Sequence, residues 1–309
     1  MNGKSPLISI ALCTYNGHEF LEEQLSSILS QSYEHLEVIV CDDGSTDGTL
    51  QIIEDFVAKD ARLRLFRNSQ NLGFNKNFEK AISLTSGEFI AISDQDDIWE
   101  ADKIELLYEH IHDNLLIFSN SLLMDRTGML LGDQLLSNFS IQDKSFKAYL
   151  LHNYTTGHTC LFRREFIKFI LPLPEVGYYD WWMGFVALYH QKITFLDQPL
   201  TRHRVHAGSV IQTVFSDENA KSQTDLFNTD LNIRQLKVFR SYKNLHKEDR
   251  KIIDELIKDL ETKKRKFSSR LFMKLVFSFE DYIVSKKKRS IFSKLNYARK
   301  YARAVGGVR

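Results

Sequence analysis

The first hundred residues alternate between short apolar runs and amphipathic segments, and this alternation constrains the fold more than any other feature. The apolar runs are 7–13, 36–41, 63–66 and 89–93. The amphipathic segments between them are 21–29, 50–57 and 75–84. Short apolar runs are typical of buried strands, and apolar residues repeating every three or four positions are typical of helices. Strands that alternate with helices predict a mainly parallel sheet covered by helices on both faces.

Polar residues follow three of these predicted strands. They are Thr14-Tyr15-Asn16, Asp42-Asp43 and the run Asp94-Gln95-Asp96-Asp97. In open sheets of this class, ligands bind beyond the carboxyl ends of the strands. We therefore expect the three clusters to meet in one crevice.

The acidic run places three carboxylates within four positions, and their mutual repulsion calls for a compensating cation. Mg2+ and Mn2+ take oxygen ligands, often one or two carboxylates together with substrate phosphates. A solvated turn, or a helix cap by Asp97 for a helix over 99–112, explains the run alone equally well. Its position after a buried strand favours a metal and diphosphate site.

Several other classes of site have no support. The sequence lacks G-x-x-x-x-G-K-[ST], G-x-G-x-x-G and H-E-x-x-H, so neither a P-loop nor a dinucleotide site nor a zinc protease is indicated. Three widely spaced cysteines fit no metal motif and suit a reducing compartment. We see no signal peptide and no run of roughly 20 apolar residues that would span a membrane. A cytoplasmic location is expected.

The pattern changes along the chain. Strands are predicted at 115–119, 159–162 and 193–196, and a helix at 181–189. Helical patterns dominate after about 212, which divides the chain into a catalytic domain (1–212) and a helical C-terminal region (213–309) that serves packing, oligomerisation or membrane association. Residues 286–309 include nine Lys or Arg and no acidic residue.

Four motifs in order resemble the family 2 glycosyltransferases of the GT-A fold. They are Cys13-Thr14-Tyr15-Asn16, Asp42-Asp43-Gly44-Ser45-Thr46-Asp47, Asn71-Leu72-Gly73 and Ser93-Asp94-Gln95-Asp96-Asp97-Ile98-Trp99. The resemblance covers about 6–212 and looks closest to bacterial rhamnosyltransferase-like enzymes of surface polysaccharide synthesis. Those enzymes share a later N-x-x-T-G (153–157) and D-W (180–181). The resemblance implies a Rossmann-like nucleotide-diphospho-sugar transferase fold.

The resemblance also implies roles for individual residues. The implied nucleotide-binding residues are Thr14, Tyr15, Asn16, Asp42, Asp43, Lys76 and Asp96. The implied metal ligands, for Mn2+ or Mg2+, are Asp96, Asp97 and His206. The implied contacts to donor sugar or diphosphate are Asp94, Gln95 and Arg204. The segment from His203 to His206 is similar to an aromatic-Arg-x-His motif, although His203 replaces the usual tyrosine.

These roles have structural alternatives. In those alternatives Tyr15 is a half-buried core aromatic, Asp42 and Asp43 are helix caps, and Lys76 is an exposed helical lysine. The order of preference between Asp94, Asp96 and Asp97 as metal ligand stays open.

Asp180 is implied to be the general base, and its aromatic neighbours support this role. Apolar surroundings raise a carboxyl pKa and make the carboxylate a better base. Trp181 and Trp182 are expected to stack on the acceptor sugar, with at least one of them serving the core instead. As an alternative, Asp180 only caps the helix at 181–189.

The predicted function is an inverting, metal-dependent glycosyltransferase that uses a UDP- or dTDP-linked sugar. Its expected acceptor is a glycan or a polyprenyl-linked glycan of bacterial surface polysaccharide. The basic C-terminus predicts binding to an anionic membrane surface at the inner face of the cell membrane. Self-association is a further option, and no motif supports nucleic-acid binding. The alternatives are a nucleotidyltransferase and a non-catalytic glycan-binding protein.

Overall fold

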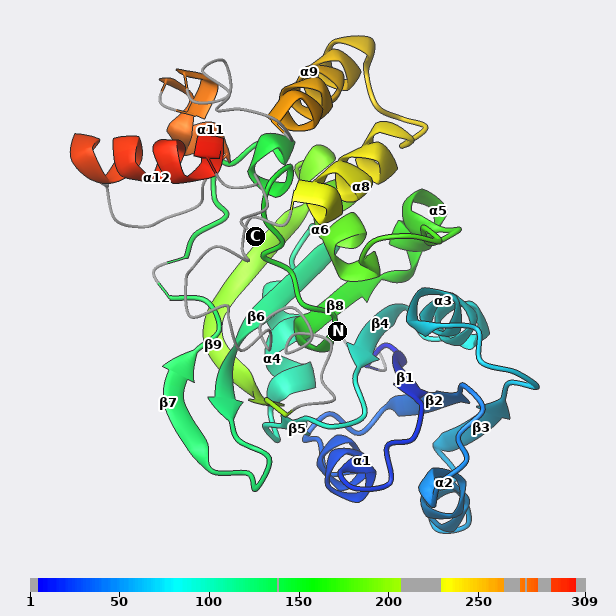
Figure 1. Cartoon of the computed structure of the whole chain (residues 1–309). Helices are drawn as coiled ribbons and strands as arrows, with labels where there is room; N and C mark the ends of the chain where they lie inside the picture. The colour runs from blue at the N-terminus through cyan, green and yellow to red at the C-terminus, as the bar shows by residue number, and fades with distance from the viewer. Residues whose placement is uncertain are drawn as a thin grey trace.

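A computed structural model describes residues 5–137, 139–206, 229–263, 273–275, 277–282 and 290–303. Within these residues, nine strands form one sheet (Figure 1). The strands are β1 (Ile8–Thr14), β2 (Leu36–Asp42), β3 (Leu63–Arg67), β4 (Phe89–Ser93), β5 (Ile98–Trp99), β6 (Leu116–Met124), β7 (Leu130–Gln134), β8 (Cys160–Arg163) and β9 (Ile193–Arg204). Every strand predicted from the sequence is present.

The sheet has the strand order β3-β2-β1-β4-β8-β6-β9-β5, and β7 pairs with β6. The first four strands are parallel, as predicted. The second half is mixed, because β8 runs antiparallel to both β4 and β6 while β6 and β9 are parallel. The parallel half therefore brings the carboxyl ends of β1, β2 and β4 to one edge of the sheet.

Helices cover both faces of the sheet (Figure 1). The first of them are α1 (Leu21–Leu29), α2 (Thr49–Val57), α3 (Phe74–Leu84), α4 (Lys103–His110), α5 (Ile167–Ile170) and α6 (Tyr179–Tyr189). Alternate residues of β1 point to different cores: Ile10 and Leu12 pack in the core that contains Leu25 and Leu107, while Ala11 packs in the core of Phe78. This alternation is the period of a strand that is buried on both sides.

The region after the acidic run differs from the prediction. Trp99 was expected to open a helix, but it belongs to β5 and pairs with Thr201 of β9. The helix begins only at Lys103, and its N-cap Asp102 makes no side-chain cap bond. Asp97 therefore does not cap this helix, and that alternative explanation of the acidic run is wrong.

The C-terminal helices lie together at one end of the molecule (Figure 1). They are α8 (Thr229–Arg240), α9 (Lys247–Lys263), α11 (Phe279–Tyr282) and α12 (Ile291–Arg303). Phe239 of α8 stacks on Phe185 of α6 with ring centroids 4.1 Å apart, and both rings are fully buried. At least α8 thus packs on the sheet-bearing part and shares its core. The expected boundary near 212 falls outside the described residues, as do the basic residues 286–289.

Candidate functional site

The carboxyl ends of β1, β2 and β4 meet, as the alternating pattern predicted. Thr14 is paired with Asp42 across β1 and β2, and Leu12 is paired with Ser93 across β1 and β4. The loops that follow all three strands are therefore neighbours. They carry the polar clusters singled out in the sequence.

The carboxylate of Asp42 is held by the protein itself. Its Oδ2 accepts a hydrogen bond of 2.9 Å from Thr14 Oγ1, and its Oδ1 accepts one of 2.9 Å from the backbone N–H of Ser45. The residue is only 1% exposed. Asp42 therefore ties the end of β1 to the turn after β2, and its contact with a base stays a prediction.

Asp43 fixes the loop that leads into α3. Its Oδ1 accepts hydrogen bonds from Asn68 Nδ2 (2.7 Å) and the Leu72 N–H (2.8 Å), and its Oδ2 accepts one from the Gly73 N–H (3.0 Å). Gly73 has φ +82°, a conformation that favours glycine. The Asn71-Leu72-Gly73 motif is thus a loop shaped around this carboxylate. Lys76 follows in the first turn of α3 and pairs with Glu79 at 3.4 Å.

Gln95 joins the acidic run to the loop after β1. Its Oε1 accepts a 2.9 Å hydrogen bond from the backbone N–H of Tyr15, and its Nε2 donates a 3.1 Å bond to the Tyr15 carbonyl. A Cβ on Gly17 would lie 2.3 Å from the same Oε1, so a larger residue at position 17 would push the Gln95 side chain aside. The Gln95 amide is bonded to the Tyr15 backbone in this structure, and its contact with a diphosphate stays a prediction. The Tyr15 ring is 49% exposed and is not a core aromatic.

Asn16 also bridges two loops. Its side-chain Oδ1 accepts a 2.9 Å hydrogen bond from the backbone N–H of Thr46, and its own N–H donates to Ser45 Oγ at 2.9 Å. The residue has φ +47°, which asparagine tolerates better than most residues. The loops that follow β1 and β2 are thereby fixed against each other.

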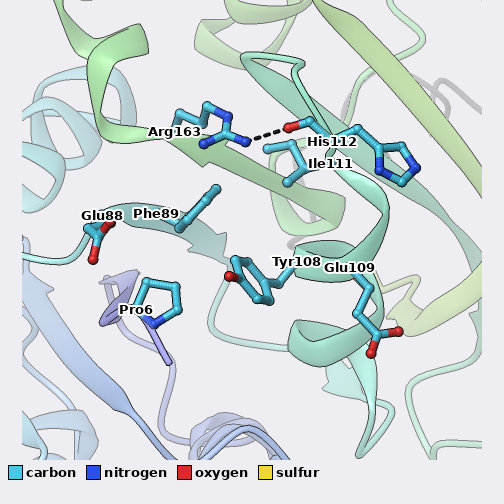
Figure 2. A pocket seen from close by; sticks show the side chains of 8 residues that line it. All are labelled: Pro6, Glu88, Phe89, Tyr108, Glu109, Ile111, His112 and Arg163. Carbon is cyan, nitrogen blue, oxygen red and sulfur yellow. Dashed lines mark hydrogen bonds between the residues drawn. The ribbon is translucent and has the colours of Figure 1, made fainter. Parts of the chain in front are cut away.

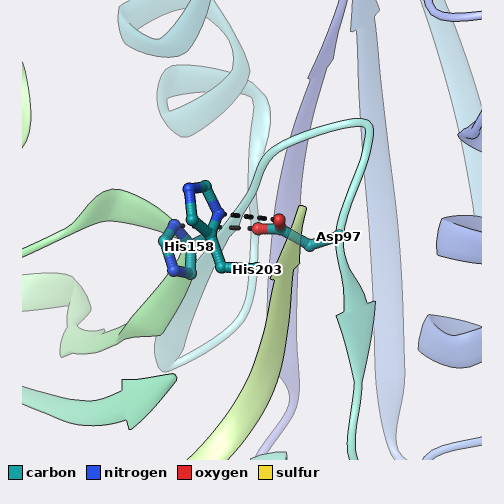
Figure 3. Close-up of side chains that lie close together, drawn as sticks. All are labelled: Asp97, His158 and His203. Carbon is teal, nitrogen blue, oxygen red and sulfur yellow. Dashed lines mark hydrogen bonds and ion pairs between the residues drawn. The ribbon is translucent and has the colours of Figure 1, made fainter. Parts of the chain in front are cut away.

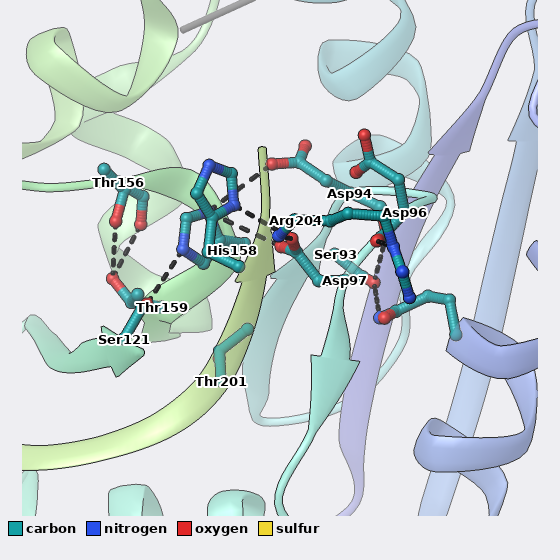
Figure 4. Close-up of polar contacts among 12 residues, drawn as sticks. Ser93, Asp94, Asp96, Asp97, Ser121, Thr156, His158, Thr159, Thr201 and Arg204 are labelled. Carbon is teal, nitrogen blue, oxygen red and sulfur yellow. Dashed lines mark hydrogen bonds and ion pairs between the residues drawn. The ribbon is translucent and has the colours of Figure 1, made fainter. Parts of the chain in front are cut away.

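The three carboxylates of the acidic run, drawn in Figure 4, differ sharply in burial. The Asp94 side chain is 37% exposed, Asp96 is 15% exposed, and Asp97 is fully buried. Asp96 Oδ2 lies 2.8 Å from His206 Nε2. Burial raises the pKa of Asp96, its neighbours Asp97 and Asp94 add to that rise, and the His206 hydrogen bond opposes it. A carboxylate oxygen and an imidazole nitrogen are both ligands that divalent cations take, and a bound cation would replace the hydrogen bond that joins them here.

Asp97 lies deeper and contacts two histidines. Its Oδ1 accepts a 3.1 Å hydrogen bond from the Arg204 N–H and lies 2.9 Å from His203 Nδ1. His158 Nδ1 lies 3.7 Å from its Oδ2. Burial acts to raise the pKa of Asp97, but the charges of His158 and His203 outweigh it and the net shift is downward. Burial lowers the pKa of His203, yet Asp97 raises it overall to about 9.

His158 was missed by the sequence interpretation, which used only the N-x-x-T-G that precedes it. It lies in the 3-10 turn η2 (Gly157–Thr159). Lys103 links this turn to β9, since its Nζ donates hydrogen bonds to the His158 carbonyl and, at 2.9 Å, to Thr201 Oγ1. The lysine is fully buried, and that burial lowers its pKa to about 7. His158 is far from the acidic run in the sequence, so no local pattern signals their contact.

Arg204 is almost fully buried, and its guanidinium has protein partners. Nη2 donates to Glu23 Oε2 at 2.6 Å, Nε to the Asp96 carbonyl at 2.9 Å, and Nη1 to the Arg126 carbonyl at 2.9 Å. In this structure the side chain therefore holds the acidic loop to α1 and to the loop after β6. Its predicted contact with diphosphate stays a prediction.

Asp180 lies in the first turn of α6 and is bonded to Asn153 of the N-x-x-T-G segment. Its Oδ1 accepts hydrogen bonds from Asn153 Nδ2 (3.0 Å) and from the Trp181 N–H (2.6 Å). Burial raises the pKa of Asp180 to about 7, and the nearby charge of Asp94 adds to the rise. A carboxyl that titrates near neutrality is suited to general-base catalysis.

The two tryptophans that follow Asp180 are core residues. Trp181 is 4% exposed and donates from Nε1 to the Tyr149 carbonyl at 2.7 Å. Trp182 is 6% exposed and donates from Nε1 to the Ile170 carbonyl at 3.0 Å. Neither ring has a face left for an acceptor sugar. The predicted stacking role is therefore wrong for both residues.

A hollow of about 350 Å³ lies at the opposite edge of the sheet (Figure 2). It is lined by Pro6, Glu88, Phe89, Tyr108, Glu109, Ile111, His112 and Arg163. Pro6 precedes β1 and Phe89 opens β4, so the hollow lies at the amino ends of these strands. None of the residues singled out in the sequence lines it.

The chain matches the family model described as Glycosyl transferase family 2 over residues 9–171, more than half of its length. It is 28% identical over 232 residues to an uncharacterized glycosyltransferase of Haemophilus influenzae, a match that covers 69% of each chain. It is 34% identical over 119 residues to a putative teichuronic acid biosynthesis glycosyltransferase, TuaG, of Bacillus subtilis. That match covers 38% of this chain and 47% of the Bacillus protein.

Solved structures share the architecture. TarS of S. aureus, crystallised as residues 1–349 with UDP-GlcNAc, superposes with a TM-score of 0.61 at 20% identity, covering 94% of this chain and 79% of that one. The mannosyltransferase PcManGT of Pyrobaculum calidifontis, in complex with GDP-Man and Mn2+, gives a TM-score of 0.54 at 15% identity, covering 97% and 86%. Likeness at this identity establishes the GT-A fold.

Proposed function

The chain belongs to glycosyl transferase family 2, and on this basis we propose that it transfers a sugar from a nucleoside diphosphate sugar to a glycan acceptor with inversion. The observation that carries this reaction is the Asp180 carboxyl, whose pKa is raised to about 7 beside Asp94 of the acidic run. A general base with a pKa near neutral pH thus lies beside the acidic loop that would hold the donor diphosphate. Inversion follows from a single displacement at the anomeric carbon.

We propose that the nucleotide lies over the joined ends of β1 and β2. The exposed Tyr15 ring offers an apolar face to a base. Asp42 and Asp43 are held rigidly in the strand-end loops by the hydrogen bonds described above. TarS was crystallised in complex with UDP-GlcNAc, which supports a uridine or thymidine diphosphate sugar as donor.

A divalent cation, Mn2+ or Mg2+, would be held by Asp96 and His206. They bring an oxygen and a nitrogen ligand together at the partly open side of the acidic run, where the cation would replace the 2.8 Å hydrogen bond between them. Such a cation neutralises the charge that develops on a departing diphosphate. The PcManGT structure contains Mn2+, which supports this assignment. Asp97 is assigned no role as a donor-site ligand because it is fully buried and bonded to His203 and Arg204.

The chemistry at the acceptor belongs to Asp180. Its carboxylate takes the proton from the acceptor hydroxyl while that oxygen forms a bond to the anomeric carbon. The bond from the same carbon to the diphosphate oxygen breaks, and the diphosphate leaves with the electron pair. Asn153 and the Trp181 N–H both donate to Oδ1, so the carboxylate is held in one orientation.

A panel of donors scored for nucleoside diphosphate release tests the proposal. The full chain, with Mn2+ or Mg2+ and glycan acceptors, should release diphosphate from a UDP- or dTDP-linked sugar above the rate without acceptor. Release of pyrophosphate from a nucleoside triphosphate would instead indicate a nucleotidyltransferase. Glycan binding with no turnover on any donor would indicate a non-catalytic protein.

We further propose that the acceptor is a lipid-linked precursor of surface polysaccharide and that α12 contacts the membrane. The name of TuaG, a putative teichuronic acid enzyme, supports this class of acceptor. Ile291 and Phe292 in the first turn of α12 are 75% and 84% exposed, and Arg299 on the same helix is exposed. Exposed apolar and basic side chains on one helix suit an anionic interface. Within the described residues, no helix is long and apolar enough to cross a bilayer.

Replacing Ile291 and Phe292 by Ser together should weaken binding to anionic vesicles by about 100-fold or more. Burying each of these side chains contributes roughly 1.5–3 kcal/mol, and both contributions are lost. Co-sedimentation with phosphatidylglycerol vesicles measures the effect. The matched control replaces Met129 and Leu131, which are 68% and 50% exposed at the start of β7, and should bind as the wild type does. Equal weakening in both variants would contradict a role for α12.

A further inference from the structure

Asp97, His158 and His203 form a buried cluster behind the acidic run (Figure 3). They are 0%, 2% and 5% exposed. They come from the loop after β4, from η2 and from β9, so three separate segments meet here. One ligand atom from each side chain can be chosen so that all three lie within 4.8 Å of one another.

Two atoms of this buried cluster have no hydrogen-bond partner among the residues that the structure describes. Asp97 Oδ2 accepts no hydrogen bond, and His203 Nε2 takes part in none. Polar atoms buried without a partner are rare in folded proteins because their hydration is lost without replacement. The other oxygen of Asp97 is satisfied by Arg204 and His203, so the carboxylate is rigidly placed while Oδ2 stays available.

His158 places a nitrogen ligand opposite Asp97 Oδ2, at a distance that suits a shared metal ion. His158 Nε2 lies 3.0 Å from Ser121 Oγ. When Nε2 donates to that hydroxyl, Nδ1 carries a lone pair, and it faces Asp97 Oδ2 at 3.7 Å and Asp94 Oδ2 at 3.6 Å. These distances are too long for hydrogen bonds. They are close to the separation of about 3.4 Å between two ligands that are each about 2.1 Å from a tetrahedral metal ion.

We propose that this cluster binds a zinc-class dication, separate from the cation at Asp96 and His206. Imidazole and carboxylate ligands together favour Zn2+ over Mg2+, which prefers oxygen alone. The two carboxylates Asp97 and Asp94 balance the charge of the ion. Ser121 on His158 and the Arg204 N–H on Asp97 are the hydrogen-bonded supports that metal ligands commonly have.

Such an ion would fasten η2 and β9 to the acidic run. His158 and His203 already stack, with ring centroids 4.5 Å apart and planes 2° from parallel. His206, three residues beyond His203, reaches Asp96 from the same strand end. Zinc is therefore expected to stabilise the donor site without touching the donor.

Metal binding to the full chain tests the proposal with Zn2+ and Co2+ alone. After chelation and dialysis, the wild type should bind Zn2+ at a second site about 100-fold more tightly than Mn2+, measured by competition with a chromophoric chelator. Co2+ at the same site should give the intense visible absorption of a four-coordinate complex with nitrogen and oxygen ligands. His158→Gln and His203→Phe should each weaken Zn2+ binding at that site by about 100-fold, and His206→Gln should leave it in place.

Each alternative result overturns the proposal. Folded wild-type protein that binds no Zn2+ beyond an Asp96–His206 ion, or a His206→Gln variant that loses all Zn2+, would do so. The Co2+ spectrum of the wild type needs no variant, so a variant that fails to fold does not leave the question open. Zinc binding here does not require sugar transfer, so an inactive protein that binds Zn2+ at this cluster would contradict only the proposed function.

Discussion

Asp180→Asn is expected to reduce sugar transfer by about 10²–10⁴-fold, the contribution of a positioned general base. An amide preserves the shape of the side chain but cannot accept the acceptor proton. The loss should appear in kcat, while the affinity for the donor, measured by titration calorimetry, stays near that of the wild type. Asp55→Asn on the outer face of α2 is the matched control and should keep full activity.

The pH dependence of sugar transfer by the wild type should also reveal Asp180 as the general base. Because burial raises the Asp180 pKa to about 7, the carboxyl is protonated and inactive below that pH and ionised above it. The value of kcat/KM should therefore rise through pH 7 and level off. The residual activity of Asp180→Asn should not show this rise in kcat/KM through pH 7. A wild-type profile flat from pH 5.5 to 8.5 would exclude Asp180 as the base.

The same shift predicts a gain in stability for the variant. The folded-state pKa lies above the unfolded value, so the ionised carboxyl disfavours folding, and stability is lost as pH rises from about 4 to 7. Asp180→Asn removes this cost. Its melting temperature at pH 8 should therefore equal or exceed that of the wild type, which separates lost catalysis from lost folding.

Removing the proposed donor-site ligands should have an effect of similar size. Asp96→Ala and His206→Ala are each expected to lower transfer by about 100-fold or more, because the charge on the departing diphosphate is no longer neutralised. Chelation of the wild type should abolish turnover, and added Mn2+ should restore it. The affinity of each variant for Mn2+, followed by its electron paramagnetic resonance signal, should fall in parallel.

His35→Ala is the control for the histidine, since this residue is exposed at the opposite edge and its side chain bonds a backbone carbonyl alone in the described contacts. It should bind Mn2+ and turn over normally. Full activity of the wild type in excess chelator would show that transfer proceeds without a divalent cation. Asp96 and His206 would then need another role.

The parallel half of the fold was predictable from sequence because its signals are local. Apolar runs such as Leu36 to Cys41, each followed by an amphipathic segment, determine strand, helix and sheet direction within about forty residues. The convergence of Thr14, Asp42 and the acidic run follows directly from parallel strands. The predicted general base Asp180 was placed by resemblance, and its raised pKa agrees with its aromatic neighbours.

The remainder depends on contacts between distant residues. Asp97 meets His203, which lies 106 positions away, and no local pattern reports that burial. Trp99 joins β5 only because β9 passes beside it. The sequence left open which of Trp181 and Trp182 contacts an acceptor and which serves the core, because the exposure of a side chain cannot be read from residue type; both are buried. In each case residues distant in the sequence determine the burial or the strand pairing of the residue. A sequence pattern contains information only about residues that are near in the chain.

The two hydrogen bonds between the Gln95 side-chain amide and the Tyr15 backbone affect how the donor preference of this enzyme could be engineered. Gln95 lies within the acidic run, which is an obvious target for site-saturation mutagenesis. Its side chain is bonded to the Tyr15 backbone and lies against Gly17. Libraries that vary residue 95 alone would remove these two hydrogen bonds and so alter the support of the loop after β1. Tyr15 is 49% exposed and is bonded to Gln95 through its backbone alone, so it is the better single position to diversify.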